Sequence, residues 1–137
     1  MDWITDQIAI GNYLDAQDTE LLRRERIVSI LSLDGSLAGR TPSDLGVQKI
    51  AVVKLQDAPG NDQGTFVRAV EAVTRFVVSS PPVLVQCHAG RSRSAVVVAG
   101  HFIKTRGIGP DEALRLIASK RELQITPGLE SLLWTLA

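Results

Sequence analysis

The residues of this chain that could do covalent chemistry lie together in the segment Cys-His-Ala-Gly-Arg-Ser-Arg-Ser, residues 87–94, directly after the apolar run 83–85. A strand that ends in a short turn and then opens a helix leaves successive backbone N–H groups unpaired and aimed at one point. Such a point suits phosphate or another tetrahedral oxyanion. Gly90 permits the tight backbone path. The pattern predicts a thiol nucleophile in a phosphate-binding loop made of Cys87, His88, Ala89, Gly90, Arg91, Ser92 and Arg93.

Arg93 and Ser94 extend this chemistry onto the first turn of the predicted helix. The planar guanidinium of Arg93 can hold two phosphate oxygens through parallel charge-assisted bonds, which lysine cannot do. The amides, the helix dipole and Arg93 also favour the thiolate form of Cys87, so we expect it to be nucleophilic at neutral pH. Ser94 can donate its hydroxyl to the thiolate when sulfur leaves. The alternative, a buried structural cysteine, explains less of the pattern.

The segment 87–94 resembles the active-site loop of the cysteine-dependent protein phosphatases, most closely that of the compact dual-specificity type, which reads HCxAGxSRS. The resemblance implies a metal-independent phosphomonoester hydrolase, a protein tyrosine or dual-specificity phosphatase, that acts through a cysteinyl-phosphate intermediate. Its substrate would be a phosphorylated protein or a small phosphate ester. The flanking segments that look like the same family are 8–11, Ala16, 18–26, 27–33, and Thr126-Pro127 with the leucines after it.

A hydrolase of this kind needs an acid to protonate the leaving oxygen. Asp57 is the candidate, because it lies thirty residues before Cys87 in a turn-rich stretch suited to a movable loop, and the family's general acid occupies such a loop at about this distance. Asp62 is the rival. Helix capping fits Asp62 better, since a helix is expected to begin near Gly64.

Two positions depart from the family pattern. Gln86 stands where relatives place a histidine immediately before the nucleophile, so thiolate activation must rest on the amides, the dipole and Arg93. Gly128 stands where relatives usually carry an asparagine after the proline. This weakens the inference of a hydrogen bond between that segment and the catalytic region.

Other functions remain open at this point. His88 and Arg91 resemble the basic residues in the loop of phosphoinositide phosphatases, although both side chains could simply face solvent at the rim. A catalytically weak phosphate-binding module is a second alternative. Sulfur transfer is a third, but its loops typically have one residue fewer before the arginine. Arsenate reduction is disfavoured because its thiol relay needs further cysteines.

The composition limits the functions, partners and location that the chain can have. With 137 residues and 45% hydrophobic content, the chain fits one catalytic domain, residues 1–137. The chain has fifteen acidic and fifteen basic side chains, so its formal net charge is zero. We therefore expect no nucleic-acid binding and no stable membrane association driven by net charge. A single cysteine and a polar start without a long apolar core predict a cytoplasmic protein. No cluster has metal-ligand spacing, so we expect neither metal nor cofactor. His101, within an apolar stretch, is expected to pack rather than catalyse.

The alternation of apolar runs and helical stripes predicts an α/β fold: a central, mostly parallel sheet of four to five strands with helices on both faces. The runs 27–33, 50–53 and 83–85 should be central, parallel strands covered on both sides. Residues 64–78 carry one apolar stripe. Four helices are predicted. The first covers residues 64–78, and the second runs from Arg93 to about Thr105 and stops at Gly107. The third begins at Pro110 and has Lys120 and Arg121 near its end, and the fourth begins at Thr126 and Pro127.

Overall fold

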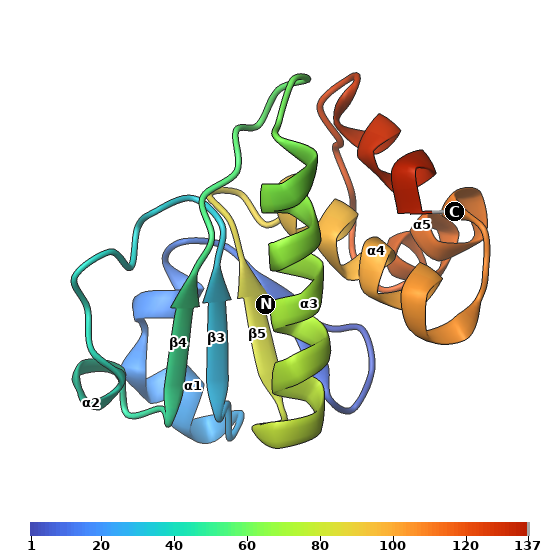
Figure 1. Cartoon of the computed structure of the whole chain (residues 1–137). Coiled ribbons are helices and arrows are strands. Elements are labelled where there is room, and N and C mark those ends of the chain that lie inside the picture. The colour runs from blue at the N-terminus through green and yellow to red at the C-terminus, as the bar shows by residue number, and fades with distance from the viewer. Residues whose placement is uncertain (137) are drawn as a thin grey trace.

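The computed structural model describes residues 1–136 and contains one five-stranded sheet with the strand order β1-β2-β5-β3-β4 (Figure 1). β1 is antiparallel to β2, and all other neighbours are parallel, as predicted. The strands are β1 (Asp2–Trp3), β2 (Ile8–Gly11), β3 (Ser29–Ser32), β4 (Lys49–Val52) and β5 (Val83–Gln86).

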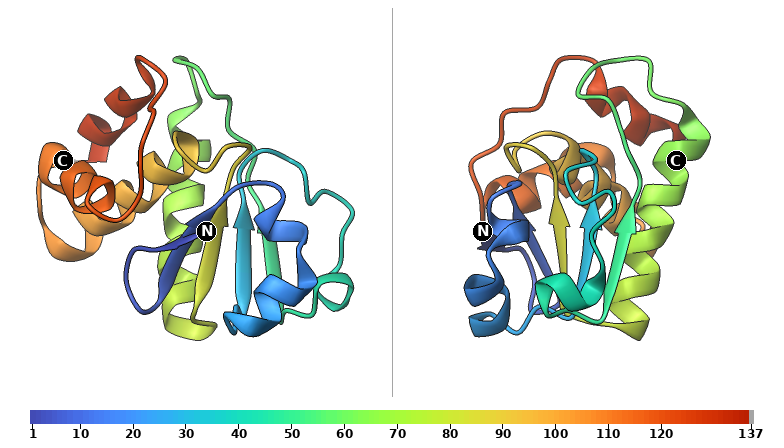
Figure 2. Two further views of the ribbon diagram at one scale, coloured as in Figure 1. Left: turned by 180° about the vertical axis from the view of Figure 1, so that it is seen from behind. Right: turned by 90° about the vertical axis from the view of Figure 1, so that its left-hand side faces the viewer.

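Helices cover both faces of the sheet, which confirms the predicted layers (Figure 2). Side chains alternate between the faces along each strand. Leu31, Val83 and Val85 pack in the core beneath the helices Gln63–Ser79 (α3) and Arg93–Arg106 (α4). Ile30 and Leu84 pack in a second core beneath the helices Thr19–Arg24 (α1) and Pro42–Leu45 (α2). The helices are η1 (Asp15–Gln17), α1 (Thr19–Arg24), α2 (Pro42–Leu45), α3 (Gln63–Ser79), α4 (Arg93–Arg106), α5 (Pro110–Ala118) and the 3-10 helix η2 (Leu129–Leu136).

The prediction of three central strands was wrong for β4. β3 and β5 are buried at every position, but β4 is the edge strand, and Lys49 and Val52 on it are exposed. An apolar run indicates a strand but not its place in the sheet, because the strand order is set by crossovers between distant segments.

The C-terminal helices also begin and end differently from the prediction. α4 stops at Gly107, whose φ of 67° provides the expected left-handed cap. α5, however, ends at Ala118, so Lys120 and Arg121 lie beyond it instead of in its last turn. η2 begins at Leu129 and not at Thr126, because Gly128 has a φ of 90°, which no helix accommodates.

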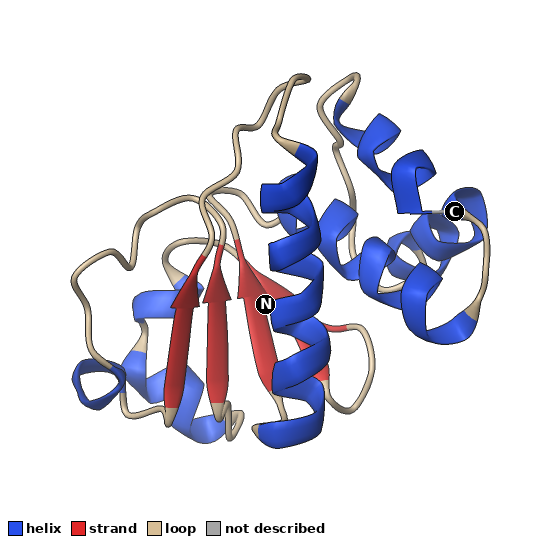
Figure 3. Ribbon diagram, in the orientation of Figure 1, coloured by secondary structure: helices blue, strands red, loops and turns tan. Residues whose placement is uncertain are grey.

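The carboxyl ends of the parallel strands meet at one edge of the sheet. The loops after β3, β4 and β5 lie together there, next to the extended segment before η2 (Figure 3). Ligands of open α/β sheets bind at this edge. No helix among residues 1–136 is long and apolar enough to cross a bilayer.

Candidate active site

Cys87 directly follows β5 and is 2% exposed. Its Sγ lies 3.2 Å from Oγ of Ser94, which is fully buried on the first turn of α4. The expected contact is therefore present. A hydroxyl at this distance can donate to a thiolate and stabilise its negative charge.

The loop between Cys87 and α4 leaves its amides free. Within residues 1–136, the backbone N–H groups of residues 88–93 have no protein acceptor. Ser92, the N-cap of α4, makes no capping bond with its side chain, so the amides of the first turn also stay available. Gly90 has a φ of 68°, and a Cβ there would lie 2.5 Å from the carbonyl oxygen of Gly11. Only glycine fits this position.

Arg93 is anchored on one side and unsatisfied on the other. Its Nη1 donates to the carbonyl oxygen of Leu55 at 3.1 Å, whereas its buried Nε has no partner among the described residues. A buried guanidinium N–H without an acceptor is unfavourable. An oxyanion held by the loop amides would supply that acceptor.

The two candidate acids differ in their contacts. Asp62 caps α3, because its carboxylate accepts from the backbone N–H of Thr65 at 2.9 Å and from the Thr65 hydroxyl at 3.1 Å. Asp57 instead contacts the phosphate-binding loop, since Ser92 Oγ donates to its Oδ1 at 2.7 Å. The Oδ2 of Asp57 has no protein partner within residues 1–136. The capping role predicted for Asp62 is confirmed.

Asn61 shapes the loop that carries Asp57, a role that the sequence did not indicate. Its Oδ1 accepts from the backbone N–H of Gln56 at 2.7 Å. Its Nδ2 donates to the carbonyl oxygens of Gln56 at 2.8 Å and Ala58 at 3.0 Å. These bonds close the turn around Asp57, and an Asn61–Asp62 motif could have suggested such a turn because Asn side chains commonly bond nearby backbone.

The segment after α5 is bonded to the loop through main-chain amides. Thr126 N–H donates to Ser92 Oγ at 3.0 Å, and Gln124 N–H donates to the Arg91 carbonyl at 3.1 Å. The segment is therefore attached to the loop even though Gly128 stands where an asparagine was expected. Ser92 bonds both Asp57 and Thr126, a linking role that was not predicted from the sequence.

Gln86 is fully buried at the end of β5 and lies in a polar network. Its Nε2 donates to Ser36 Oγ at 3.1 Å, and Ser36 Oγ donates to Asp34 at 2.7 Å. Partial burial raises the pKa of the Asp34 carboxyl, but hydrogen bonds, chiefly from Ser36, outweigh it, so this pKa lies below its ordinary value. The carboxylate thus stays ionised at neutral pH. Gln86 is a non-titrating donor at the position where the resemblance led us to expect a histidine.

His88 and Arg91 are both exposed at the rim. The His88 ring also stacks on Tyr13, with ring centroids 4.5 Å apart and planes 4° from parallel. Arg91 borders a shallow pocket of about 300 Å³ beside the loop. The residues lining this pocket are Asp57, Ala89, Arg91, Ser92, Gln124, Ile125, Thr126 and Pro127.

His101 lies outside this site, as predicted. It is 6% exposed, and its Nδ1 lies 2.8 Å from Thr74 Oγ1 between α4 and α3. Among the described residues, no group of three or more His, Cys, Asp or Glu side chains is arranged to hold a metal ion.

Comparisons with known proteins agree with this geometry. The chain is 29% identical over 119 residues to dual specificity protein phosphatase 1B of Arabidopsis thaliana, which covers 86% of this chain and 70% of that protein. A crystal structure of a mouse putative dual specificity phosphatase complexed with zinc tungstate has a TM-score of 0.84 at 28% identity, and the match covers 98% of this chain and 84% of that one.

A third relative differs in its printed function. Human phosphatidylglycerophosphatase and protein-tyrosine phosphatase 1 is 34% identical over 87 residues, which are 61% of this chain and 42% of that protein. The chain spans between 59% and 70% of the length of the first four curated relatives. The family model for the catalytic domain of dual specificity phosphatases matches residues 10–134. The chain therefore belongs to the dual specificity phosphatase family.

Proposed function

We propose that this chain hydrolyses phosphomonoesters of tyrosine, serine or threonine in proteins through a cysteinyl-phosphate intermediate. The observation that carries the proposal is the buried Nε of Arg93, which lacks an acceptor in the described part of the chain, beside a loop whose amides are unpaired there. Cys87 lies at the start of that loop, so a bound phosphate would meet a sulfur nucleophile. Residues 1–137 would form one catalytic domain.

In the first step Cys87 Sγ attacks phosphorus, a P–S bond forms, and the ester P–O bond breaks. Asp57 gives its proton to the departing oxygen. Arg93 and the amides of residues 88–93 stabilise the equatorial oxygens in the in-line transition state. These groups supply the positive charge that a metal ion supplies in other phosphoryl-transfer sites, so a chelator should not inhibit.

In the second step the Asp57 carboxylate takes a proton from water while the water oxygen attacks phosphorus. The P–S bond breaks and inorganic phosphate forms. Ser94 Oγ, 3.2 Å from the sulfur, donates to the departing thiolate and stabilises it. Because this mechanism needs a reduced thiol, we further propose that the protein acts in the cytoplasm.

The test is a pre-steady-state assay with an aryl phosphate. We expect a burst of aryl alcohol equal to the enzyme concentration, followed by slower turnover. Cys87→Ser should abolish the burst and still bind the ester. Binding of phosphate esters by the wild type without any release of alcohol would instead identify a phosphate-binding module.

A second substrate class follows from the exposed basic side chains His88 and Arg91 and from the relative that is named a phosphatidylglycerophosphatase. Basic side chains at the rim suit a lipid headgroup with more than one phosphate. Comparing phosphate release from phosphotyrosine peptides with release from inositol lipids decides between the classes. We expect the peptides to be the better substrates.

A further inference from the structure

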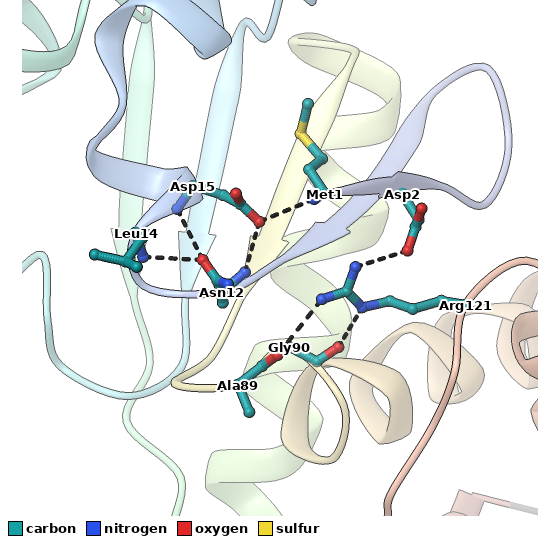
Figure 4. Close-up of polar contacts among 8 residues, drawn as sticks. All are labelled: Met1, Asp2, Asn12, Leu14, Asp15, Ala89, Gly90 and Arg121. Carbon is teal, nitrogen blue, oxygen red and sulfur yellow. Dashed lines mark hydrogen bonds and ion pairs between the residues drawn. The ribbon is translucent and has the colours of Figure 1, made fainter.

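Arg121 contacts the outer side of the phosphate-binding loop, although it lies beyond α5 and 31 residues from Gly90. Its Nε donates to the carbonyl oxygen of Gly90 at 2.6 Å, and its Nη2 lies 3.4 Å from the carbonyl oxygen of Ala89. Its Nη1 pairs with the carboxylate of Asp2 at 2.8 Å (Figure 4). The Arg121 side chain is 11% exposed, so these contacts are partly shielded from water.

These bonds fix the orientation of peptide groups that the proposed mechanism uses. In a trans peptide the C=O and the N–H of the next residue point in opposite directions. Holding the carbonyls of Ala89 and Gly90 outward therefore turns the N–H groups of Gly90 and Arg91 the other way, toward the loop interior. The backbone N–H of Tyr13 holds the His88 carbonyl at 3.1 Å in the same manner, which orients the N–H of Ala89.

Each guanidinium nitrogen of Arg121 makes one bond within the protein, unlike those of Arg93. The Arg121 guanidinium bonds two successive carbonyls and one carboxylate, whereas Arg93 has a buried Nε without a partner among residues 1–136. Asp2 balances the positive charge of Arg121, so little of that charge is left for a substrate. The cation also polarises the peptide groups that it bonds and strengthens their N–H groups as donors.

We propose that Arg121 is a positioning residue, which orients the loop amides toward the phosphate, and that Asp2 orients Arg121. The proposal rests on the hydrolase function proposed above. Lysine cannot replace Arg121, because a single ammonium group lacks the fork that spans two carbonyls and a carboxylate. Asp2→Asn keeps an acceptor for Nη1 but removes the balancing charge, so its effect should be smaller.

The experiment compares wild type, Arg121→Lys, Asp2→Asn and Lys120→Ala. Lys120 is a matched control, because it is the adjacent cation and is exposed. Three quantities are measured: kcat for an aryl phosphate, the Ki of inorganic vanadate, and the melting temperature. We expect Arg121→Lys to lower kcat and raise the vanadate Ki, each about tenfold or more, because amide donors to the oxyanion are misaligned. Asp2→Asn should fall between Arg121→Lys and wild type, and Lys120→Ala should match wild type.

Other outcomes separate this inference from the proposed function. A lower melting temperature with kcat and vanadate Ki unchanged in Arg121→Lys indicates a merely structural role and overturns the inference. If Arg121→Lys does not fold, Asp2→Asn decides on the same two quantities. A wild-type chain that neither hydrolyses the ester nor binds vanadate overturns the proposed function itself.

Discussion

At the scale of single residues, the same side chain has different functions because of its partners. Arg93 and Arg121 are both arginines near one loop, yet Arg93 has a buried Nε without an acceptor among residues 1–136, whereas each guanidinium nitrogen of Arg121 is bonded. Asp57 and Asp62 lie five residues apart, yet Asp62 is occupied in capping α3 while Asp57 bonds Ser92. Unsatisfied hydrogen-bonding groups are therefore as informative about the role of a side chain as the bonds that it makes.

The acid assignment is tested by exchanging each aspartate for asparagine. Asp57→Asn keeps an acceptor for the Ser92 hydroxyl but cannot donate a proton from a carboxyl group. We expect kcat for a phosphate ester with a poor leaving group to fall by about 100-fold or more, in line with the usual contribution of general acid catalysis. Steady-state assays with alkyl and activated aryl esters measure the difference, which should be much smaller for the activated ester.

Asp62→Asn is the matched control for this prediction. Asparagine is as good an N-cap as aspartate, so α3 should keep its first turn and activity should stay near that of wild type. Unchanged turnover of the alkyl ester in Asp57→Asn would refute the assignment. A large loss in Asp62→Asn would transfer the acid role to that residue.

At the scale of elements, polar side chains join the ends of β3 and β5 next to Cys87. Gln86 on β5 reaches Ser36, and Ser36 reaches Asp34 after β3. The register pairs Ser32 with Gln86, which brings these segments together although they are more than fifty residues apart in the chain. The network lies directly before Cys87 and stabilises the ends of β3 and β5 where the loop begins.

Ser36→Ala tests this network. The substitution removes the acceptor for the buried Gln86 amide and one donor to Asp34, so we expect the free energy of unfolding to fall by about 1–3 kcal/mol. Urea denaturation at pH 7 measures it. Ser43→Ala, at an exposed serine on α2, should change this free energy by no more than about 0.5 kcal/mol. Equal effects of the two substitutions would mean that the Gln86–Ser36–Asp34 network adds no stability.

At the scale of the whole molecule, features that depend on neighbouring residues were predicted well from the sequence. Features that depend on contacts between distant segments were not. The cap at Gly107 and the cap at Asp62 depend on a few neighbouring residues, so the sequence indicated both. The edge position of β4 depends on strand order. The partners of Arg121 lie at least 31 residues away in the chain, and only the folded chain brings them together. The loop of residues 87–94 could be proposed as the site from the sequence alone, because its candidate residues are contiguous in the chain.

His101, buried between α3 and α4, makes the stability of the whole molecule depend on pH. Burial lowers the pKa of its imidazole, and the positive charge of Arg106 lowers it further. Because the native state holds this histidine neutral while the unfolded state protonates near the reference pKa of 6.5, the unfolded state binds more protons at mildly acidic pH. Stability from neutral His101 is therefore complete above that pH and decreases as the pH falls below it.

We expect the free energy of unfolding to drop between pH 7 and pH 5, with a contribution from His101 of at most about 1.4 kcal/mol per pH unit. Urea denaturation of wild type, His101→Gln and His88→Gln over this range measures it. His101→Gln should flatten the pH dependence, since glutamine can still bond Thr74 without titrating. His88→Gln, which removes the exposed second histidine, should retain the wild-type slope. A slope that persists in His101→Gln and vanishes in His88→Gln would assign the effect to the rim of the phosphate-binding loop instead of the interface between α3 and α4.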